Sequence, residues 1–190
     1  MSPYPVFLRL EGRTVLVVGA GPVAAEKAKK LASAGARVRT VSPEVSEEYT
    51  RLGLAVTRAP FDEAHLEGVY FVVAAAPPEV NRRVFEAAER RAIFVLAVDD
   101  PAHGSAFGGA VITRGDATVV VGTGGRAPAL SGLLREALEE LLPVDLAAWV
   151  DVASLLRPAL AARGLPLAKR REAVLSVLVE KYARQGKGAA

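Results

Sequence analysis

The stretch TVLVVGAGPVAAEKAKKLASAGARV, residues 14–38, is the part of this chain that is most informative about its fold. It begins with TVLVV, an apolar and β-branched run that predicts a buried strand. Glycines follow, and apolar residues then recur at helical spacing until Gly35, a typical helix stop. The run ARVRTV predicts a second strand. This order of strand, glycine turn, helix and strand predicts a βαβ unit with parallel strands.

The same alternation continues through the first half of the chain. Further strands are expected at 54–58, 69–75 and 93–98, and a helix at 78–91 with proline at its start. The sequence therefore predicts the α/β class, a Rossmann-type parallel sheet with helices on both faces. Ligands of such sheets bind beyond the carboxyl ends of the strands, where the winding direction reverses.

The pattern changes after Pro101. Residues 109–123 predict two antiparallel strands joined by a tight turn at Arg114, Gly115 and Asp116, since no helix separates them. Three helices are expected after the hairpin, at 128–142, 144–163 and 167–184.

Composition excludes several classes of site and partner. The 190 residues contain no cysteine and only two histidines, so disulfides and thiolate metal sites are excluded and no metal site is predicted. The net charge is +3 and aromatic residues make up 6%, which does not favour nucleic-acid binding. No apolar run is long enough to span a membrane and no signal peptide is recognised, so a cytoplasmic protein is expected.

The first glycine loop has the spacing G-x-G-x-x-A. Gly19 permits a tight turn, Gly21 lets the backbone approach a pyrophosphate, and Ala24 lets the helix pack close to the strand. Pro22 and Val23 lie between them at the helix start, where free N–H groups favour an anion. We predict a dinucleotide site formed by these residues, and the alternative is a purely structural turn.

The end of the second strand leaves the choice between NAD and NADP open. The acidic residue expected there is missing, and the sequence offers Ser42 and then Glu44. Ser42 can hydrogen-bond a ribose or a phosphate, so we place it among the cofactor-binding residues. Arg39 would favour a 2′-phosphate, unless strand alternation points it elsewhere.

Asp99 and Asp100 follow the fifth strand, at the edge where a nicotinamide ring is expected. A carboxylate there can accept a proton, and the alternative is a turn before Pro101.

A second strand–glycine–helix junction contains Thr123, Gly124, Gly125 and Arg126. Its backbone and its arginine can bind an acidic partner, and the alternative is a plain turn before a helix.

Four segments of the chain together resemble one family. They are YPVFLRLEGRTVLVVGAGPVA, VVAAAPPEVNRRV, VDDP and TGGRAPALSGLLREALEELLP. In order and spacing they are similar to the precorrin-2 dehydrogenase family, also found as the N-terminal half of sirohaem synthases. The resemblance covers residues 4 to about 143. Ala75, within the second segment, is included among the cofactor-binding residues.

The resemblance implies an activity. Members use NAD to oxidise precorrin-2, an acidic tetrapyrrole, to sirohydrochlorin on the way to sirohaem or cobalamin, and some also insert ferrous iron. Asp99 matches the catalytic aspartate, and Thr123, Gly124, Gly125 and Arg126 are the expected substrate contacts.

The resemblance also implies a homodimer formed by the region after the Rossmann-type domain. With the change of pattern after Pro101, this divides the chain into an NAD-binding domain at 1–108, a dimerisation region at 109–143 and a helical C-terminal domain at 144–190.

Two other functions remain possible from the residues alone. One is an NAD(P)-dependent oxidoreductase that acts on another small molecule, in which the second glycine loop is structural. The other is a regulatory module that senses NAD. Such a module needs no carboxylate beside the nicotinamide, so a variant of Asp99 separates it from an enzyme.

Overall fold

A computed structural model describes residues 3–186, with side chains described for residues 3–180. The chain divides into two compact units. The first contains the residues up to Gly109 together with Gly122–Pro128, and the second contains Ala110–Val121 and the residues from Ala129 onward. The three-part division drawn from the sequence remains a prediction.

The first unit contains a parallel sheet. Its strands in the described residues are β1 (Thr14–Val18), β2 (Arg37–Val41), β3 (Val56–Thr57), β4 (Phe71–Ala74) and β5 (Phe94–Ala97). They lie in the order β3-β2-β1-β4-β5, and every pairing is parallel. The predicted Rossmann-type sheet is confirmed, and the winding direction reverses between β1 and β4. β3 is shorter than the predicted 54–58, because this edge strand pairs only with Thr40 and Val41 of β2.

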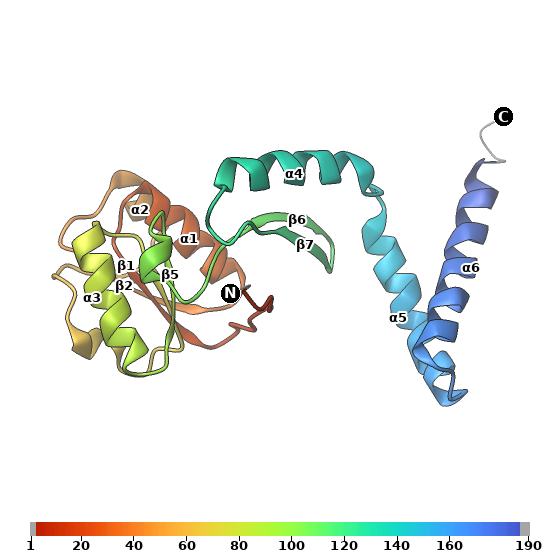
Figure 1. Cartoon of the computed structure of the whole chain (residues 1–190), viewed down its shortest axis with the longest axis horizontal. Helices are drawn as coiled ribbons and strands as arrows, with labels where there is room; N and C mark the ends of the chain where they lie inside the picture. The colour runs from red at the N-terminus through yellow and green to blue at the C-terminus, as the bar shows by residue number, and fades with distance from the viewer. Residues whose placement is uncertain (1–2, 187–190) are drawn as a thin grey trace. The chain divides into compact units, whose positions relative to one another are not determined.

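Helices cover both faces of this sheet (Figure 1). They are α1 (Pro22–Ser33), α2 (Glu47–Thr50) and α3 (Pro78–Glu89), with the short 3-10 helices η1 (Glu63–Leu66) and η2 (Pro101–His103). Alternate residues of β1 enter different cores. Val15 and Val17 pack with α1 and α2, whereas Leu16 and Val18 pack with α3 and η1.

The helix α1 ends as the sequence predicts. Ala34 is the C-cap, and Gly35 follows with a φ of +77°, a left-handed conformation that glycine adopts without strain. The amide of Gly35 donates to the carbonyl of Ala32 and the amide of Ala36 to that of Leu31, which closes the helix end.

The exposed edge of β5 is covered by the chain itself. The amides of Ser105 and Ala106 donate to the carbonyl of Val95, and the Ser105 hydroxyl accepts from the Val95 amide at 3.0 Å. The segment after β5 therefore turns back along the strand, which protects an edge that would otherwise offer unpaired backbone groups.

The second unit contains the predicted hairpin and helices. β6 (Ala110–Arg114) pairs antiparallel with β7 (Ala117–Val121). The helices are α4 (Pro128–Leu141), α5 (Leu146–Ala162) and α6 (Leu167–Gly186). Arg114 of the hairpin donates to Glu139 of α4 at 3.1 Å, which ties these two elements together.

None of the helices in the described part of the chain is both long and apolar enough to cross a membrane.

Candidate functional site

The first glycine loop connects β1 to α1 at the carboxyl edge of the sheet. Gly21 is the N-cap of α1, and no side chain caps the helix there. A Cβ built on Gly21 would have no atom within 4 Å, so the space in front of this residue is open. The amides of Val23 and Ala24 in the first turn face that end of the helix. Uncapped amides beside an open glycine fit the pyrophosphate of a dinucleotide.

Gly19 has a different task from Gly21. Its φ is +105°, and a Cβ built on it would lie 2.2 Å from the carbonyl oxygen of Ala75. Ala75 follows β4 and donates its own amide to the carbonyl of Val18 at 2.8 Å. Gly19 is therefore needed for the close approach of the two loops that flank the point where the winding direction reverses.

Ser42 lies at the end of β2 and is buried. Its hydroxyl donates to the carbonyl of Glu44 at 2.6 Å, so its proton is already used and only lone pairs remain for a ligand. Close by in the chain, the amide of Ser46 donates to the carbonyl of Ala20 at 2.9 Å. This contact holds the segment after β2 against the first glycine loop.

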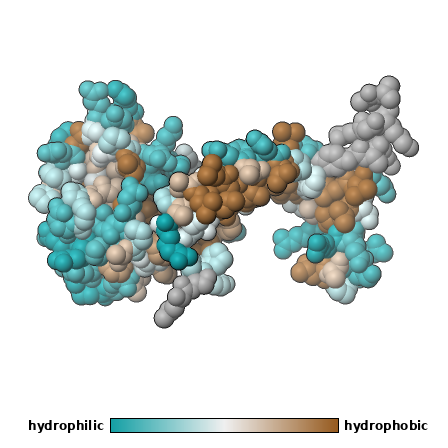
Figure 2. Space-filling model, turned by 45° about the horizontal axis from the view of Figure 1, so that its top comes forward, coloured by the Kyte–Doolittle hydropathy of each residue, from teal (hydrophilic) through white to brown (hydrophobic). Residues whose placement is uncertain are grey.

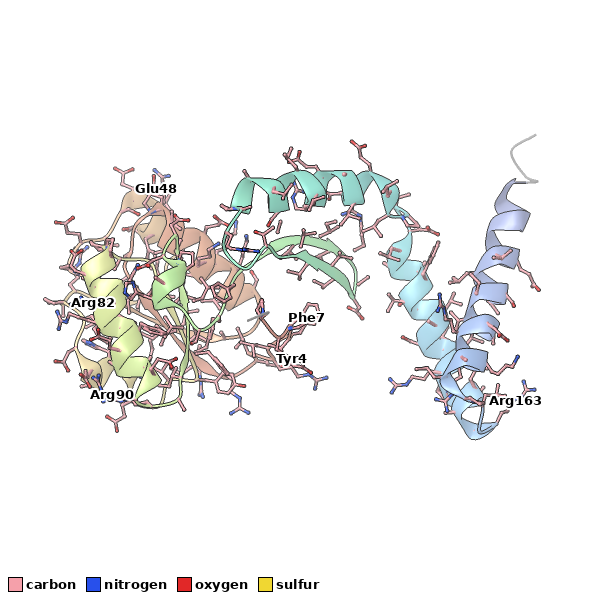
Figure 3. The ribbon with its side chains drawn as sticks, in the orientation of Figure 1. Tyr4, Phe7, Glu48, Arg82, Arg90 and Arg163 are labelled. Atoms are coloured by element: carbon pink, nitrogen blue, oxygen red, sulfur yellow. The ribbon has the colours of Figure 1, made fainter. Side chains whose placement is uncertain are left out.

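Arg39 and Arg82, two arginines that could supply positive charge to the site, make contacts elsewhere in this structure. Arg39 donates to the carbonyls of Glu67 and His65 at 3.0 and 3.3 Å, so its side chain is turned toward η1. Arg82 pairs with Glu86 at 3.6 Å, and Figure 3 shows it on the solvent side of α3. The suggestion from the sequence that Arg39 selects a 2′-phosphate is therefore not supported by its position.

Asp99 lies two residues beyond β5 and is exposed. Its φ is +57°, a left-handed conformation that is uncommon outside glycine and that aspartate tolerates better than most residues. Among the described residues, no hydrogen bond or ion pair is recorded for its carboxylate. The side chain is therefore available to a ligand at the carboxyl edge of the sheet.

The second glycine loop lies against the segment that follows Asp99. Gly124 and Gly125 both have positive φ, and a Cβ on Gly125 would lie 3.2 Å from Pro101 and 3.3 Å from Phe107. Both contacts are within the first compact unit. The structure therefore brings together two loops that are distant in sequence and that the sequence singled out separately. Arg126 is exposed, and no ion pair of its side chain is recorded in the described part of the chain.

One supporting residue was missed by the sequence analysis. Asn81, in the first turns of α3, is 1% exposed and accepts a hydrogen bond from the amide of Ala76 at 3.1 Å. It stabilises the β4–α3 loop that contacts Gly19. The only sequence signal was an asparagine shortly after two prolines, which is also common in solvent-exposed helix starts.

Asp100 and His103 are also joined in a way that the sequence did not predict. The carboxylate oxygens of Asp100 lie 2.9 and 3.0 Å from Nδ1 of His103. Within the described residues, no group of three or more histidine, aspartate or glutamate side chains gathers as metal ligands would.

Taken together, the strand order, the open Gly21 and the contact of Gly19 with Ala75 define a dinucleotide-binding protein of the Rossmann type. Comparison with known families agrees. The sequence model of a family described as "Putative NAD(P)-binding" matches residues 6–110, more than half of the chain. The chain belongs to this NAD(P)-binding family.

Individual relatives have more specific names. The chain is 41% identical to "Siroheme synthase 1" of Aeromonas salmonicida over 177 residues, which cover 90% of this chain and 38% of the relative. It is 43% identical to "Siroheme synthase 2" of the same species over 160 residues, 83% of this chain and 33% of the relative. The chain thus spans 33–38% of the length of these two curated relatives.

A solved structure shares the fold over most of the chain. It is described as "SirC, precorrin-2 dehydrogenase", and it superimposes with a TM-score of 0.67 at 24% identity. The match covers 92% of this chain and 88% of that chain. At this identity the likeness establishes the fold.

Proposed function

We propose that the protein is an NAD-dependent precorrin-2 dehydrogenase, which oxidises precorrin-2 to sirohydrochlorin in the formation of sirohaem or cobalamin. The observation that carries the proposal is the exposed Asp99 carboxylate at the carboxyl edge of a sheet whose first glycine loop fits a dinucleotide. The relatives named siroheme synthase and the fold shared with a precorrin-2 dehydrogenase support the choice of substrate.

The residues have separate tasks in this proposal. Gly19, Gly21, Pro22, Val23, Ala24 and Ala75 form the cradle for the dinucleotide. The nicotinamide supplies a hydride acceptor when it is bound. Oxidation of the tetrapyrrole releases a hydride and a proton, and Asp99 accepts the proton. Thr123, Gly124, Gly125 and Arg126 contact the carboxylates of the substrate, and the Arg126 charge attracts them.

We propose NAD as the cofactor in preference to NADP. The hydroxyl proton of Ser42 is donated to Glu44, so Ser42 presents only an acceptor to the cofactor. A ribose 2′-hydroxyl can donate to this acceptor, whereas a 2′-phosphate carries negative charge and offers only acceptors at neutral pH. The arginine that would compensate the phosphate, Arg39, is turned toward η1.

We also propose a homodimer formed through the second unit. Leu130, Leu133, Leu134 and Leu141 lie on α4 with 43–79% of each side chain exposed. Their spacing follows one helical stripe, and Figure 2 shows apolar surface gathered over this part of the chain. A second copy of the chain would bury the stripe. Leu133→Glu is expected to yield monomers in analytical ultracentrifugation, and an unchanged mass would contradict the proposal.

The proposed location is the cytoplasm, where a chain without cysteine loses nothing to a reducing environment. No nucleic-acid or membrane partner is proposed.

The test is incubation with precorrin-2 and NAD, followed by the absorption spectra of sirohydrochlorin and NADH. Asp99→Asn is the sharpest variant, because asparagine also tolerates a left-handed backbone while it removes the carboxylate. We expect NAD affinity to persist in this variant and turnover to fall at least about 100-fold. Full turnover would refute the role of Asp99.

The same assay separates the alternative functions. A wild-type protein that oxidises other substrates but not precorrin-2 would favour the general oxidoreductase. A wild-type protein that binds NAD without turnover would favour the sensor. A parallel sample with ferrous iron tests for iron insertion.

A further inference from the structure

The loop that carries Asp99 has a conformation that needs support. Asp99 adopts a left-handed backbone, which costs a non-glycine residue about 1 kcal/mol or more. Its side chain has no recorded partner among the described residues that would compensate this cost. The residues that follow it make contacts that can hold this conformation.

Asp100 and His103 supply such support. The two carboxylate oxygens of Asp100 lie 3.0 and 2.9 Å from Nδ1 of His103, and the His103 amide donates to the Asp100 carbonyl at 3.1 Å. The side chains are 15% and 30% exposed, so the pair is largely shielded from water. The imidazole also packs edge-on against Phe85 of α3, with ring centres 6.3 Å apart and planes at 65°.

This packing indicates a positioning role. Phe85 lies seven residues after Pro78, which places it about 10 Å along α3 from the end nearest the glycine loops. The imidazole is therefore held against the side of α3, and its Nδ1 proton is used by Asp100. The pair thus closes the η2 turn and anchors it to α3.

The same turn contacts the second glycine loop. Pro101 lies between the two paired residues, and its side chain is the nearest neighbour of the position that a Gly125 Cβ would occupy, at 3.2 Å. A shift of the η2 turn would therefore move Asp99 on one side and the Thr123–Arg126 loop on the other.

We propose that Asp100 and His103 are positioning residues that hold Asp99 and the second glycine loop in register with each other. The expected effect on turnover rests on the proposed function, whereas the expected effect on the structure of the loops does not. A displacement of about 1 Å between reacting groups can reduce turnover by about 100-fold.

The experiment compares three substitutions of His103. Asparagine places an N–H donor near the position of Nδ1, glutamine places one near Nε2, and alanine removes both. We expect kcat to fall about 10- to 100-fold in His103→Ala and His103→Gln, and to remain within about threefold of wild type in His103→Asn. NAD affinity should be unchanged in all three, because the first glycine loop is not touched. The opposite pattern, rescue by glutamine and loss in asparagine, would show proton transfer by Nε2 and overturn the proposal.

A second measurement does not depend on turnover. In amide NMR spectra, His103→Ala should shift the Gly125 resonance, and His103→Asn should leave it close to its wild-type position. Asp100→Ala should produce the same shift, and the double variant with His103→Ala should add little, because the two residues act as one unit. An unchanged Gly125 resonance in His103→Ala would overturn the inference even if precorrin-2 is not the substrate. Absence of precorrin-2 oxidation by the wild-type protein, together with the expected shifts, would refute the proposed function alone.

Discussion

Gly21→Asp is expected to weaken cofactor binding without weakening the fold. Gly21 has a φ of −80° and a ψ of −178°, an extended conformation that any residue adopts. A Cβ there meets no atom within 4 Å, so the substitution causes no clash in the free protein. Aspartate is also a good N-cap and interacts favourably with the helix N-terminus. We expect the free energy of unfolding to stay level or to rise by up to about 1 kcal/mol.

The same carboxylate would oppose the pyrophosphate. Two unit charges about 4 Å apart repel by about 4 kcal/mol at an effective dielectric constant of about 20. This corresponds to a loss of about three orders of magnitude in the affinity for NAD. The matched control is Gly21→Asn, which has a similar size and capping ability but no charge, and which should lose much less affinity.

Two measurements check this prediction. Urea denaturation of the cofactor-free protein gives the free energy of unfolding, and isothermal titration calorimetry gives the dissociation constant for NAD. Affinity within about tenfold of wild type in Gly21→Asp would show that the pyrophosphate does not bind at this turn. A destabilisation of more than about 2 kcal/mol would show that the residue is needed for folding, contrary to its open surroundings.

The other predictions concern the residues that support the loops. Gly19→Ala should destabilise the free protein by at least about 2 kcal/mol in urea denaturation, because its φ is +105° and its Cβ would meet a backbone carbonyl at 2.2 Å; a stable variant would contradict the close approach. Asn81→Ala should cost about 1 kcal/mol in the same measurement, since it removes the acceptor of the partly buried Ala76 amide, whereas Asn81→Asp keeps an acceptor and should cost less. Burial raises the pKa of Tyr49 above its ordinary 10.0, and therefore the folded protein holds this proton more tightly than the unfolded chain. This contribution to the free energy of unfolding is complete below pH 10 and is lost as pH rises through the raised pKa of Tyr49. Tyr49→Phe should remove this part of the pH dependence, measured by urea denaturation at several pH values.

The sequence predicted those parts of the fold that depend on neighbours in the chain. The strand at 14–18, the helix start at Pro22 and its end at Gly35 follow from periodicity and glycine placement, and all are observed. The hairpin was predicted for the same reason, since the Gly115–Asp116 turn is a local feature. The extent of β3 was predicted wrongly, as 54–58, because an edge strand continues only as far as its neighbour pairs with it.

The features of the candidate site could also be predicted from the sequence only in part. The spacing of Gly19, Gly21 and Ala24 indicated a dinucleotide loop and a separate task for each residue, but it did not show which distant segment Gly19 must approach. Only the structure shows that Gly19 is required by the carbonyl of Ala75, more than fifty residues later in the chain, whereas Gly21 faces open space.

The class of fold and the position of the candidate dinucleotide loop could be predicted from the amino-acid sequence alone, because hydrophobic period and glycine conformation act over a few residues. Which side chains are available at the candidate site depends on tertiary packing. In the folded protein Arg39 donates to a carbonyl next to η1, Asp100 pairs with His103, and Gly125 lies close to Pro101. These contacts depend on how whole elements pack, and packing between distant segments leaves no regular spacing in the sequence.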